Sequence, residues 1–181
     1  MTLLILGLVL WTGAHLFKRI APDARAGMGD RGKLVATVLI LLSIVLMYYG
    51  YKSADGPVWW GRSAPLVGIN NLLMLLAFYL YAASGLKTAI TRRIRHPQLT
   101  AVKVWAVSHL LVNGDLPSFV LFGGILAWAV VSVILINRAV PNWTRPAPQP
   151  MWKEGAAIVG AVVVTGLVMG LHNWLGYQPW G

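Results

Sequence analysis

Few side chains in this sequence can bind a metal or carry a proton. Its imidazoles are those of His15, His96, His109 and His172, and it contains no cysteine. Without thiols, disulfides, zinc–thiolate sites, iron–sulfur clusters and thiolate-ligated haem are excluded. Neutral imidazoles on facing helices suffice to hold a haem b iron, but they serve equally well in a proton relay or in helix packing. The residue types alone leave these three alternatives open.

A basic run, Arg92-Arg93-Ile94-Arg95-His96-Pro97-Gln98, is the second feature with chemical potential. Three guanidinium groups at a membrane surface are able to bind the propionates of haem, a phosphorylated head group or a pyrophosphate. The same charges are also explained by an inner loop with a proline at the start of the next helix. Both interpretations stay open, with Arg92, Arg93, Arg95 and His96 as candidate cofactor-binding residues.

Apolar segments must position these residues. The sequence is 57% hydrophobic and 11% charged over 181 residues, which is too apolar for a water-soluble domain. We therefore expect an all-α integral membrane bundle of about six transmembrane helices, with residues 1–181 as a single domain. The expected spans are about 2–17, 34–51, 64–86, 98–112, 116–136 and 155–174. The fourth is short and contains Lys103, so whether it crosses depends on the distribution of charge.

The distribution of basic residues predicts the topology. If the chain starts outside and crosses six times, thirteen of its fifteen Lys and Arg residues fall inside, and only Lys52 and Arg62 fall outside. This pattern follows the positive-inside rule and predicts a bacterial inner membrane with both termini in the periplasm. The basic residues lie in short runs between apolar segments, so the net charge of +10 reflects topology and no nucleic-acid partner is expected.

From the basic run onward the sequence resembles a known family. Three segments carry the likeness: Arg95-His96-Pro97-Gln98, Val104-Trp105-Ala106-Val107-Ser108-His109-Leu110 and Asn113-Gly114-Asp115. They are similar to the central motif of NnrU proteins, bacterial membrane proteins associated with denitrification. The likeness extends through nearly the whole chain, including Gly13-Ala14-His15-Leu16-Phe17-Lys18-Arg19 and Asn137-Arg138. It implies a factor for expression, maturation or sensing in nitrogen-oxide metabolism.

A more distant resemblance is to the 15-cis-zeta-carotene isomerase of plastids and cyanobacteria. The shared features are Arg-His-Pro-Gln and the spacing Trp-(x)₃-His-(x)₃-Asn-Gly, here Trp105, His109 and Asn113-Gly114. This likeness implies haem b as cofactor, with His15 and His109 as the axial ligands. The relative has a cysteine, proposed to exchange with its second ligand, where this chain has Ala106. Ligand exchange by a thiolate is therefore impossible here.

The implied ligand pair conflicts with a simple estimate of depth. His15 lies near the inner end of its span and His109 toward the outer end, about 10 Å apart along the membrane normal at 1.5 Å per residue. Helix tilt is able to remove such a difference. Depth alone pairs His15 with His96, or His109 with His172. We prefer the ligand pair that the resemblance implies, His15 with His109, and keep the other two pairs as alternatives.

The sequence thus predicts a haem b-binding, NnrU-type membrane protein linked to denitrification, with the lipid bilayer and haem as partners and nitric oxide as a candidate ligand. The alternative is a haem-dependent, isomerase- or reductase-like enzyme that acts on a lipid-soluble small molecule. Such an enzyme would draw on Asn113, Asp115 and the Asn70-Asn71 pair, although a turn and helix packing explain these residues equally well. A third class is a structural subunit whose histidines only pack. Protein partners cannot be named from the sequence.

Overall fold

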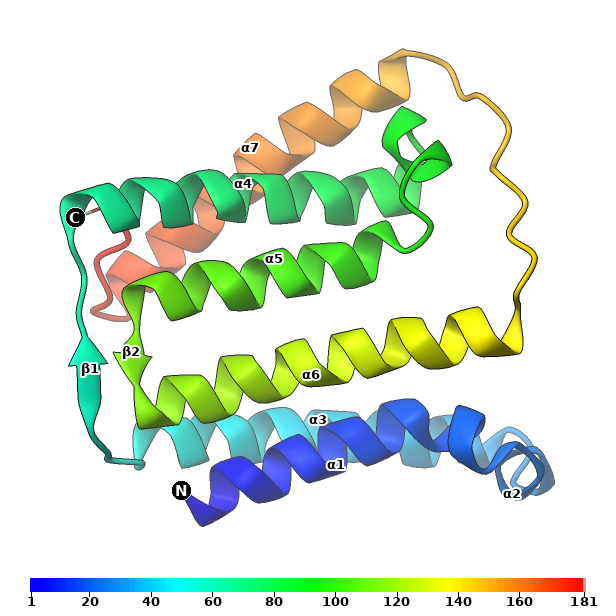
Figure 1. Ribbon diagram of the computed structural model, residues 1–181, viewed down its shortest axis with the longest axis horizontal. Helices are drawn as coiled ribbons and strands as arrows, with labels where there is room; N and C mark the ends of the chain where they lie inside the picture. The colour runs from blue at the N-terminus through cyan, green and yellow to red at the C-terminus, as the bar shows by residue number, and fades with distance from the viewer. Residues whose placement is uncertain (181) are drawn as a thin grey trace.

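The computed structural model describes residues 1–180 and is mainly helical (Figure 1). The elements follow one another as α1 (Thr2–Ile20), α2 (Pro22–Gly27), α3 (Arg31–Lys52), β1 (Val58–Trp60), α4 (Ala64–Leu86), the 3₁₀ helix η1 (Ala89–Arg92), α5 (Pro97–Val112), β2 (Gly114–Asp115), α6 (Leu116–Ala139) and α7 (Trp152–Trp174). The expected all-α membrane bundle is confirmed.

Five helices, α1, α3, α4, α6 and α7, are long and apolar enough to cross a membrane. The sixth expected span corresponds to α5, which has 16 residues. Its length is about 24 Å at 1.5 Å per residue, less than the apolar layer of about 30 Å. Nevertheless α5 lies alongside α4 and α6 and connects opposite ends of the bundle (Figure 1). Among the described residues, the helices that meet the length for a span therefore number one fewer than predicted. Successive loops still lie at alternate ends of the bundle, as six crossings require.

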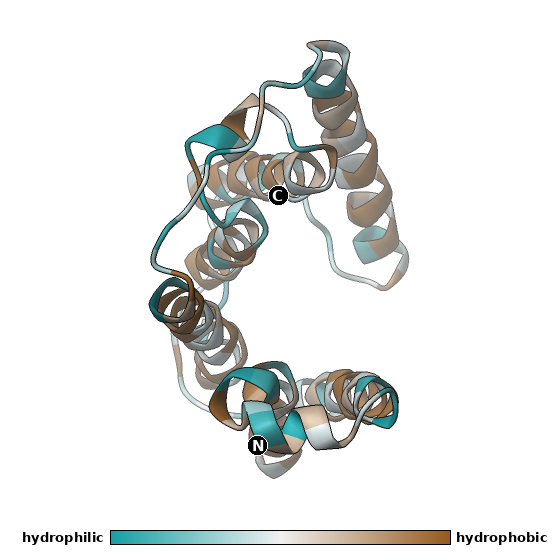
Figure 2. Ribbon diagram, turned by 90° about the vertical axis from the view of Figure 1, so that its right-hand side faces the viewer, coloured by the Kyte–Doolittle hydropathy of each residue, from teal (hydrophilic) through white to brown (hydrophobic). Residues whose placement is uncertain are grey.

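The helices form one curved row instead of a closed barrel of helices. Contacts between neighbours give the order α3, α1, α6, α5, α4, α7. Seen end-on, the row bends into a C, with α3 and α7 at its tips (Figure 2). An apolar cluster of Leu4, Leu16, Met47, Ile125, Trp128 and Ala129 joins α1, α3 and α6. The concave side of the row is therefore the place where distant helices face each other.

Gly7 of α1 and Gly50 of α3 allow these two helices to pack closely. At Gly7 of α1, an added Cβ would lie 2.6 Å from Met47 Cγ and 2.8 Å from Met47 N on α3. Only a residue without a Cβ allows these two backbones to approach so closely. Gly7 therefore fixes α1, the helix that carries His15, against α3.

The loops separate into two groups at opposite ends of the bundle. Both termini, β1 and β2 lie at one end, and α2, η1 and the connection from α6 to α7 lie at the other (Figure 1). At the first end β1 pairs antiparallel with β2, with Val58 opposite Asp115 and Trp60 opposite Gly114. The loops that the charge pattern assigned to one side thus share one end of the bundle, which we call the basic end. Which membrane surface this end faces stays a prediction.

Candidate functional site

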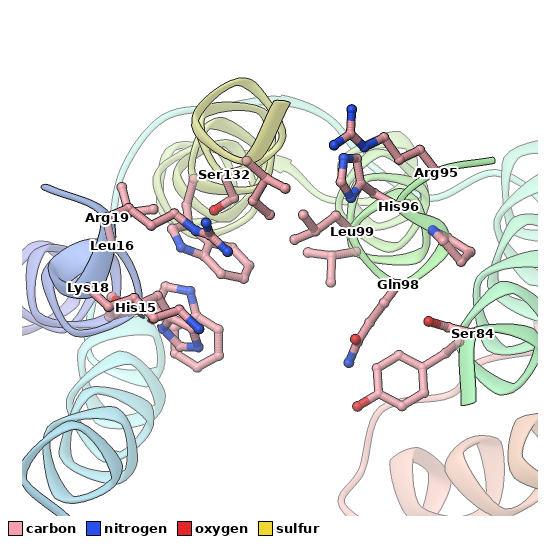
Figure 3. Close-up of a pocket in the computed structure, with 16 residues that line it drawn as sticks. His15, Leu16, Lys18, Arg19, Ser84, Arg95, His96, Gln98, Leu99 and Ser132 are labelled. Carbon is pink, nitrogen blue, oxygen red and sulfur yellow. Dashed lines mark hydrogen bonds between the residues drawn. The ribbon is translucent and has the colours of Figure 1, made fainter. Parts of the chain in front are cut away.

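The first pocket on the concave side lies toward the basic end and has a volume of about 560 Å³. We call it the basic pocket. It is lined by Trp11, His15, Leu16, Lys18, Arg19, Tyr81, Ser84, Arg95, His96, Pro97, Gln98, Leu99, Val102, Trp128, Ser132 and Ile136. Figure 3 shows the side chains of α1 on one side and those of α4 and α5 on the other, with Ser132 of α6 between them. The pocket is large enough for a bulky cofactor.

His15 is held in one orientation in the wall of the basic pocket. Its Nδ1–H donates to the carbonyl of Trp11 one turn earlier, at 2.9 Å. Because a carbonyl only accepts, this bond fixes the neutral tautomer in which Nε2 carries a free lone pair. The ring packs against Trp11 at 4.1 Å and Trp128 at 4.8 Å between ring centroids. An imidazole fixed through Nδ1 with Nε2 open is the usual arrangement of a metal-ligating histidine.

Donors without partners surround this imidazole. The indole Nε1 atoms of Trp11 and Trp128 are buried, and no atom of the described residues accepts a hydrogen bond from them. Buried donors of this kind are uncommon and indicate a site for an acceptor. Sequence reasoning overlooked both tryptophans, although the position of Trp11 four residues before His15 places the two side chains on one helix face.

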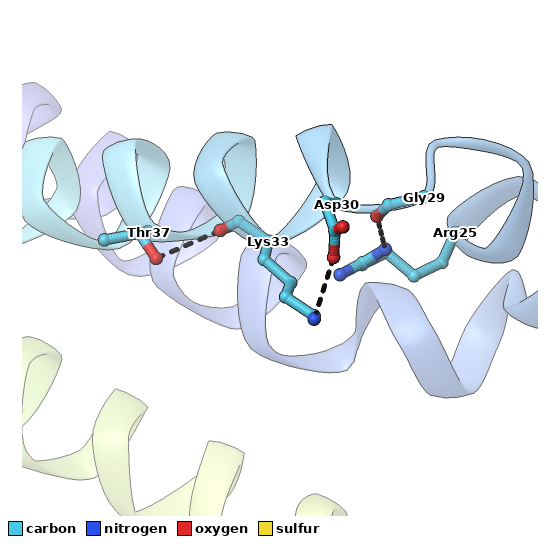
Figure 4. Close-up of polar contacts among 5 residues, drawn as sticks. All are labelled: Arg25, Gly29, Asp30, Lys33 and Thr37. Atoms are coloured by element: carbon cyan, nitrogen blue, oxygen red, sulfur yellow. Dashed lines mark hydrogen bonds and ion pairs between the residues drawn. The ribbon is translucent and has the colours of Figure 1, made fainter.

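The charges lining the basic pocket are all positive: Lys18, Arg19 and Arg95. Within residues 1–180 the one ion pair is Lys33–Asp30, at 2.9 Å at the start of α3 and outside the pocket (Figure 4). No carboxylate therefore neutralises the three cations. Arg95 donates to the carbonyl of Val140. The pocket combines apolar walls with unneutralised cations, which suits a ligand that has an apolar body and anionic groups.

Only part of the basic run lines this pocket. Arg95 and His96 line it, but Arg92 and Arg93 do not line either pocket. Arg92 donates through Nε to the carbonyl of Pro146 at 3.2 Å. The Nε2–H of His96 donates to Asn137 Oδ1 at 2.8 Å, so Nδ1 is its free ring nitrogen.

A second pocket, of about 310 Å³, lies toward the end that carries β1 and β2. We call it the histidine-pair pocket, after His109 and His172. Its other lining residues are Tyr48, Tyr51, Arg62, Val67, Asn70, Asn71, Met74, Phe78, Val112, Asn113, Phe122, Thr165, Val168, Met169, Tyr177, Gln178 and Pro179. The residues from α4 and α7 recur at three- and four-residue intervals, so each helix turns one face inward.

His109 and His172 repeat the arrangement of His15. The Nδ1–H of His109 donates to the carbonyl of Trp105 at 2.9 Å, and that of His172 to Val168 at 2.8 Å. The His109 ring also packs against Phe122 of α6, with 4.8 Å between centroids. Both histidines therefore present Nε2 as an acceptor.

The structure does not bring the expected ligand pair into one pocket. His15 contacts Trp128 and His109 contacts Phe122, six residues apart on α6. This offset corresponds to about 9 Å along the helix at 1.5 Å per residue. The two pairs chosen by depth do share pockets, His15 with His96 and His109 with His172. Among residues 1–180 no group of three or more His, Cys, Asp or Glu side chains gathers to hold a metal ion.

The other polar candidates have structural partners. Asp115 caps α6 by accepting from the backbone N–H of Ser118 at 2.8 Å and from its hydroxyl at 2.9 Å. The Asn113 side chain donates to the carbonyl of His109 at 2.9 Å. Both residues therefore shape the turn between α5 and α6, as the turn interpretation predicted.

These features define a multi-span helical membrane protein with two histidine-lined pockets on the concave side of its helix row. The model of one protein family, described as NnrU protein, matches residues 3–179 of the chain. The chain belongs to the NnrU family, and the resemblance found in its sequence is confirmed. Comparison with curated proteins and with solved structures found no match. The distant likeness to the carotene isomerase therefore stays a prediction.

Proposed function

We propose that this NnrU protein binds haem b in the basic pocket and acts in denitrification, in the expression or maturation of nitrogen-oxide reductases or in nitric oxide sensing. The observation that supports this most directly is His15, with Nε2 free beside two indole N–H groups that lack partners. The residues fit the cofactor. A neutral imidazole suits the iron, apolar and aromatic walls suit the macrocycle, and Lys18, Arg19 and Arg95 suit its two propionates. Bound haem supplies an iron centre able to bind nitric oxide or carry an electron.

The chain's own residues would orient the cofactor. The carbonyl of Trp11 keeps the proton of His15 on Nδ1, and packing between Trp11 and Trp128 limits rotation of the ring. The cations at the basic end attract carboxylates and leave the apolar part of a ligand between the helices. These interactions require no movement of α1.

The second axial ligand in this proposal comes from another helix than α1. We keep His109, which the family resemblance implies and whose Nε2 is free. For His15 and His109 to ligate the same iron, α1 and α5 must shift relative to each other parallel to α6. This shift is needed because the two imidazole rings contact α6 at different levels. His96 already shares the pocket, but its Nε2–H is hydrogen-bonded to Asn137.

Absorption spectra of the purified protein test the proposal. We expect a red preparation with a low-spin haem spectrum that sharpens on addition of dithionite. His15→Ala and His109→Ala should each abolish or convert this spectrum, because one axial ligand is lost. His172→Ala is the matched control and should leave the spectrum nearly unchanged. A colourless wild-type protein would refute haem binding, and bleaching by His96→Ala with a red His109→Ala protein would replace His109 by His96.

A second candidate function, a haem-dependent enzyme acting on a lipid-soluble substrate, is favoured by the histidine-pair pocket. The surface of this cavity is mostly apolar, and His109 lies in its wall. Turnover of a polyene or quinone that depends on His109 would support the enzyme. Haem binding with no such turnover would leave the sensing or maturation role.

We also propose that the basic end faces the cytoplasm of a bacterial cell and both termini the periplasm. The supporting observation is the common location of the basic loops at one end of the bundle (Figure 1).

A further inference from the structure

The histidine-pair pocket has a mainly apolar surface and several polar side chains. Asn70 and Asn71 reach it from α4, and His172 from the last turns of α7. The tail after α7 packs beside Asn71, since the Asn71 side chain donates to the carbonyl of Pro179 at 3.0 Å. Apolar cavities with a few convergent polar groups are typical of small-molecule sites.

A relay of amides fixes which atom Asn70 presents. The Pro179 carbonyl only accepts, so the side-chain nitrogen of Asn71 must face it. The oxygen of Asn71 then faces Asn70 and accepts from its Nδ2 at 3.2 Å. Asn70 Oδ1 takes no part in this relay. It is buried, and among residues 1–180 it has no hydrogen-bond partner.

His172 also presents an acceptor. Its Nδ1–H is used by the Val168 carbonyl at 2.8 Å, so the neutral imidazole offers the lone pair of Nε2. The pocket thus has at least two acceptors, Asn70 Oδ1 and His172 Nε2. Leaving such acceptors unsatisfied in an apolar environment is costly, so an occupant that donates hydrogen bonds is favoured.

The charge of the lining determines what kind of donor fits. No Asp or Glu lines the pocket, and its charged residue is Arg62. A buried ammonium group or metal ion would therefore lack a counter-charge. An anion at Asn70 Oδ1 and His172 Nε2 would meet two acceptors, and Arg62 is the lining cation with which it would pair instead. Two neutral hydroxyl groups, one for each acceptor, satisfy Asn70 Oδ1 and His172 Nε2 without this cost.

We propose that the histidine-pair pocket binds a membrane-dissolved molecule with hydroxyl groups on its head, such as a hydroquinone, whose hydroxyls donate to Asn70 Oδ1 and His172 Nε2. The apolar part of the molecule lies against Met74, Phe78 and Met169. Neither of the two acceptors belongs to the proposed haem site, so this inference does not depend on haem binding. If His109 does ligate haem, the head of the bound molecule lies in the same pocket as that ligand.

Equilibrium binding of tritium-labelled decylhydroquinone to the full-length, detergent-purified protein under anaerobic conditions tests the proposal. We expect saturable binding that decylhydroquinone competes for and that its dimethyl ether, which has no hydroxyl donor, does not. Asn70→Leu and His172→Phe should each weaken binding about two- to tenfold, the effect of losing one hydrogen bond. Thr37→Val is the matched control. Thr37 lines neither pocket and its hydroxyl donates to the Lys33 carbonyl at 3.0 Å, so binding should not change.

The thermal stability of each variant shows whether it is folded. Asn70→Leu breaks the amide relay, and if that variant does not fold, His172→Phe still tests the proposal. Equal binding of hydroquinone and dimethyl ether, absence of saturable binding, or unchanged affinity in the folded variants would overturn the proposal. Loss of haem from His172→Phe would also overturn it, since haem would then occupy this pocket. His15→Ala separates the two sites: it should remove haem and leave hydroquinone binding unchanged.

Discussion

Replacing Gly7 by alanine should loosen the contact between α1 and α3. Gly→Ala inside a helix normally stabilises by about 0.5–1 kcal/mol. At Gly7 the new Cβ would meet Met47 Cγ at 2.6 Å, Met47 N at 2.8 Å and the Ser43 carbonyl at 2.9 Å. Two of these three atoms belong to the backbone of α3 and cannot turn away, so the helices must separate. Overpacking of this kind costs about 1–3 kcal/mol, which exceeds the gain in helix propensity.

Gly13→Ala is the matched control in the same helix, because nothing lies within 4 Å of a Cβ built there. Thermal unfolding of the detergent-purified proteins, followed by tryptophan fluorescence, compares the two variants. Gly7→Ala should lower the Tm by about 2–4 °C for each kcal/mol lost, and Gly13→Ala should leave the Tm equal or higher. Equal Tm values for the two variants would refute the reasoning that Gly7 sets the distance between α1 and α3.

Two further predictions concern topology and the docking of α7. Reporter fusions at Lys33 and Arg145 should behave as cytoplasmic and a fusion at the C-terminus as exported; a cytoplasmic C-terminus would mean that α5 does not cross. Glu154→Gln should lower stability by about 1–3 kcal/mol, because the carboxylate accepts from the Tyr79 hydroxyl of α4 and from the backbone N–H of Ala89. A Glu154→Gln protein with the melting temperature of the wild type would show that this pair of bonds does not hold α7.

The long helices were predictable because lipid selects for long apolar runs. The segment expected at 64–86 is α4 (Ala64–Leu86), and the one at 116–136 is α6 with three further residues at its C-terminal end. The order of the helices in the row was not predictable. Faces toward lipid and faces toward protein are both apolar in a membrane, so hydrophobic periodicity does not reveal neighbours. The pairing of β1 with β2 was missed because two or three residues are too few for a strand pattern.

The depth of each histidine could be predicted from the sequence, but the arrangement of the histidines around the pockets could not. Position along a helix gives depth, which is why the estimate for His15 and His109 agrees with their offset along α6. Depth does not reveal how each helix is rotated about its axis or which helices are its neighbours. The sequence therefore could not choose among the three candidate histidine pairs. Trp11 and Trp128 were missed because no sequence feature distinguishes an indole with a free N–H from one that packs.

The basic run still has two explanations, and the structure separates them by residue. Arg93 and Arg95 carry the same charge in the same loop, so they contribute equally to the positive-inside signal. Only Arg95 lines the basic pocket, where no carboxylate competes for it. Arg95→Ala should therefore lower the affinity for haem about ten- to a hundredfold, the effect of losing a charged hydrogen bond, while Arg93→Ala leaves it unchanged. Haem titration of both proteins, with reporter fusions to verify their topology, measures the difference. Equal affinities would mean that the run orients the protein in the membrane and has no part in ligand binding.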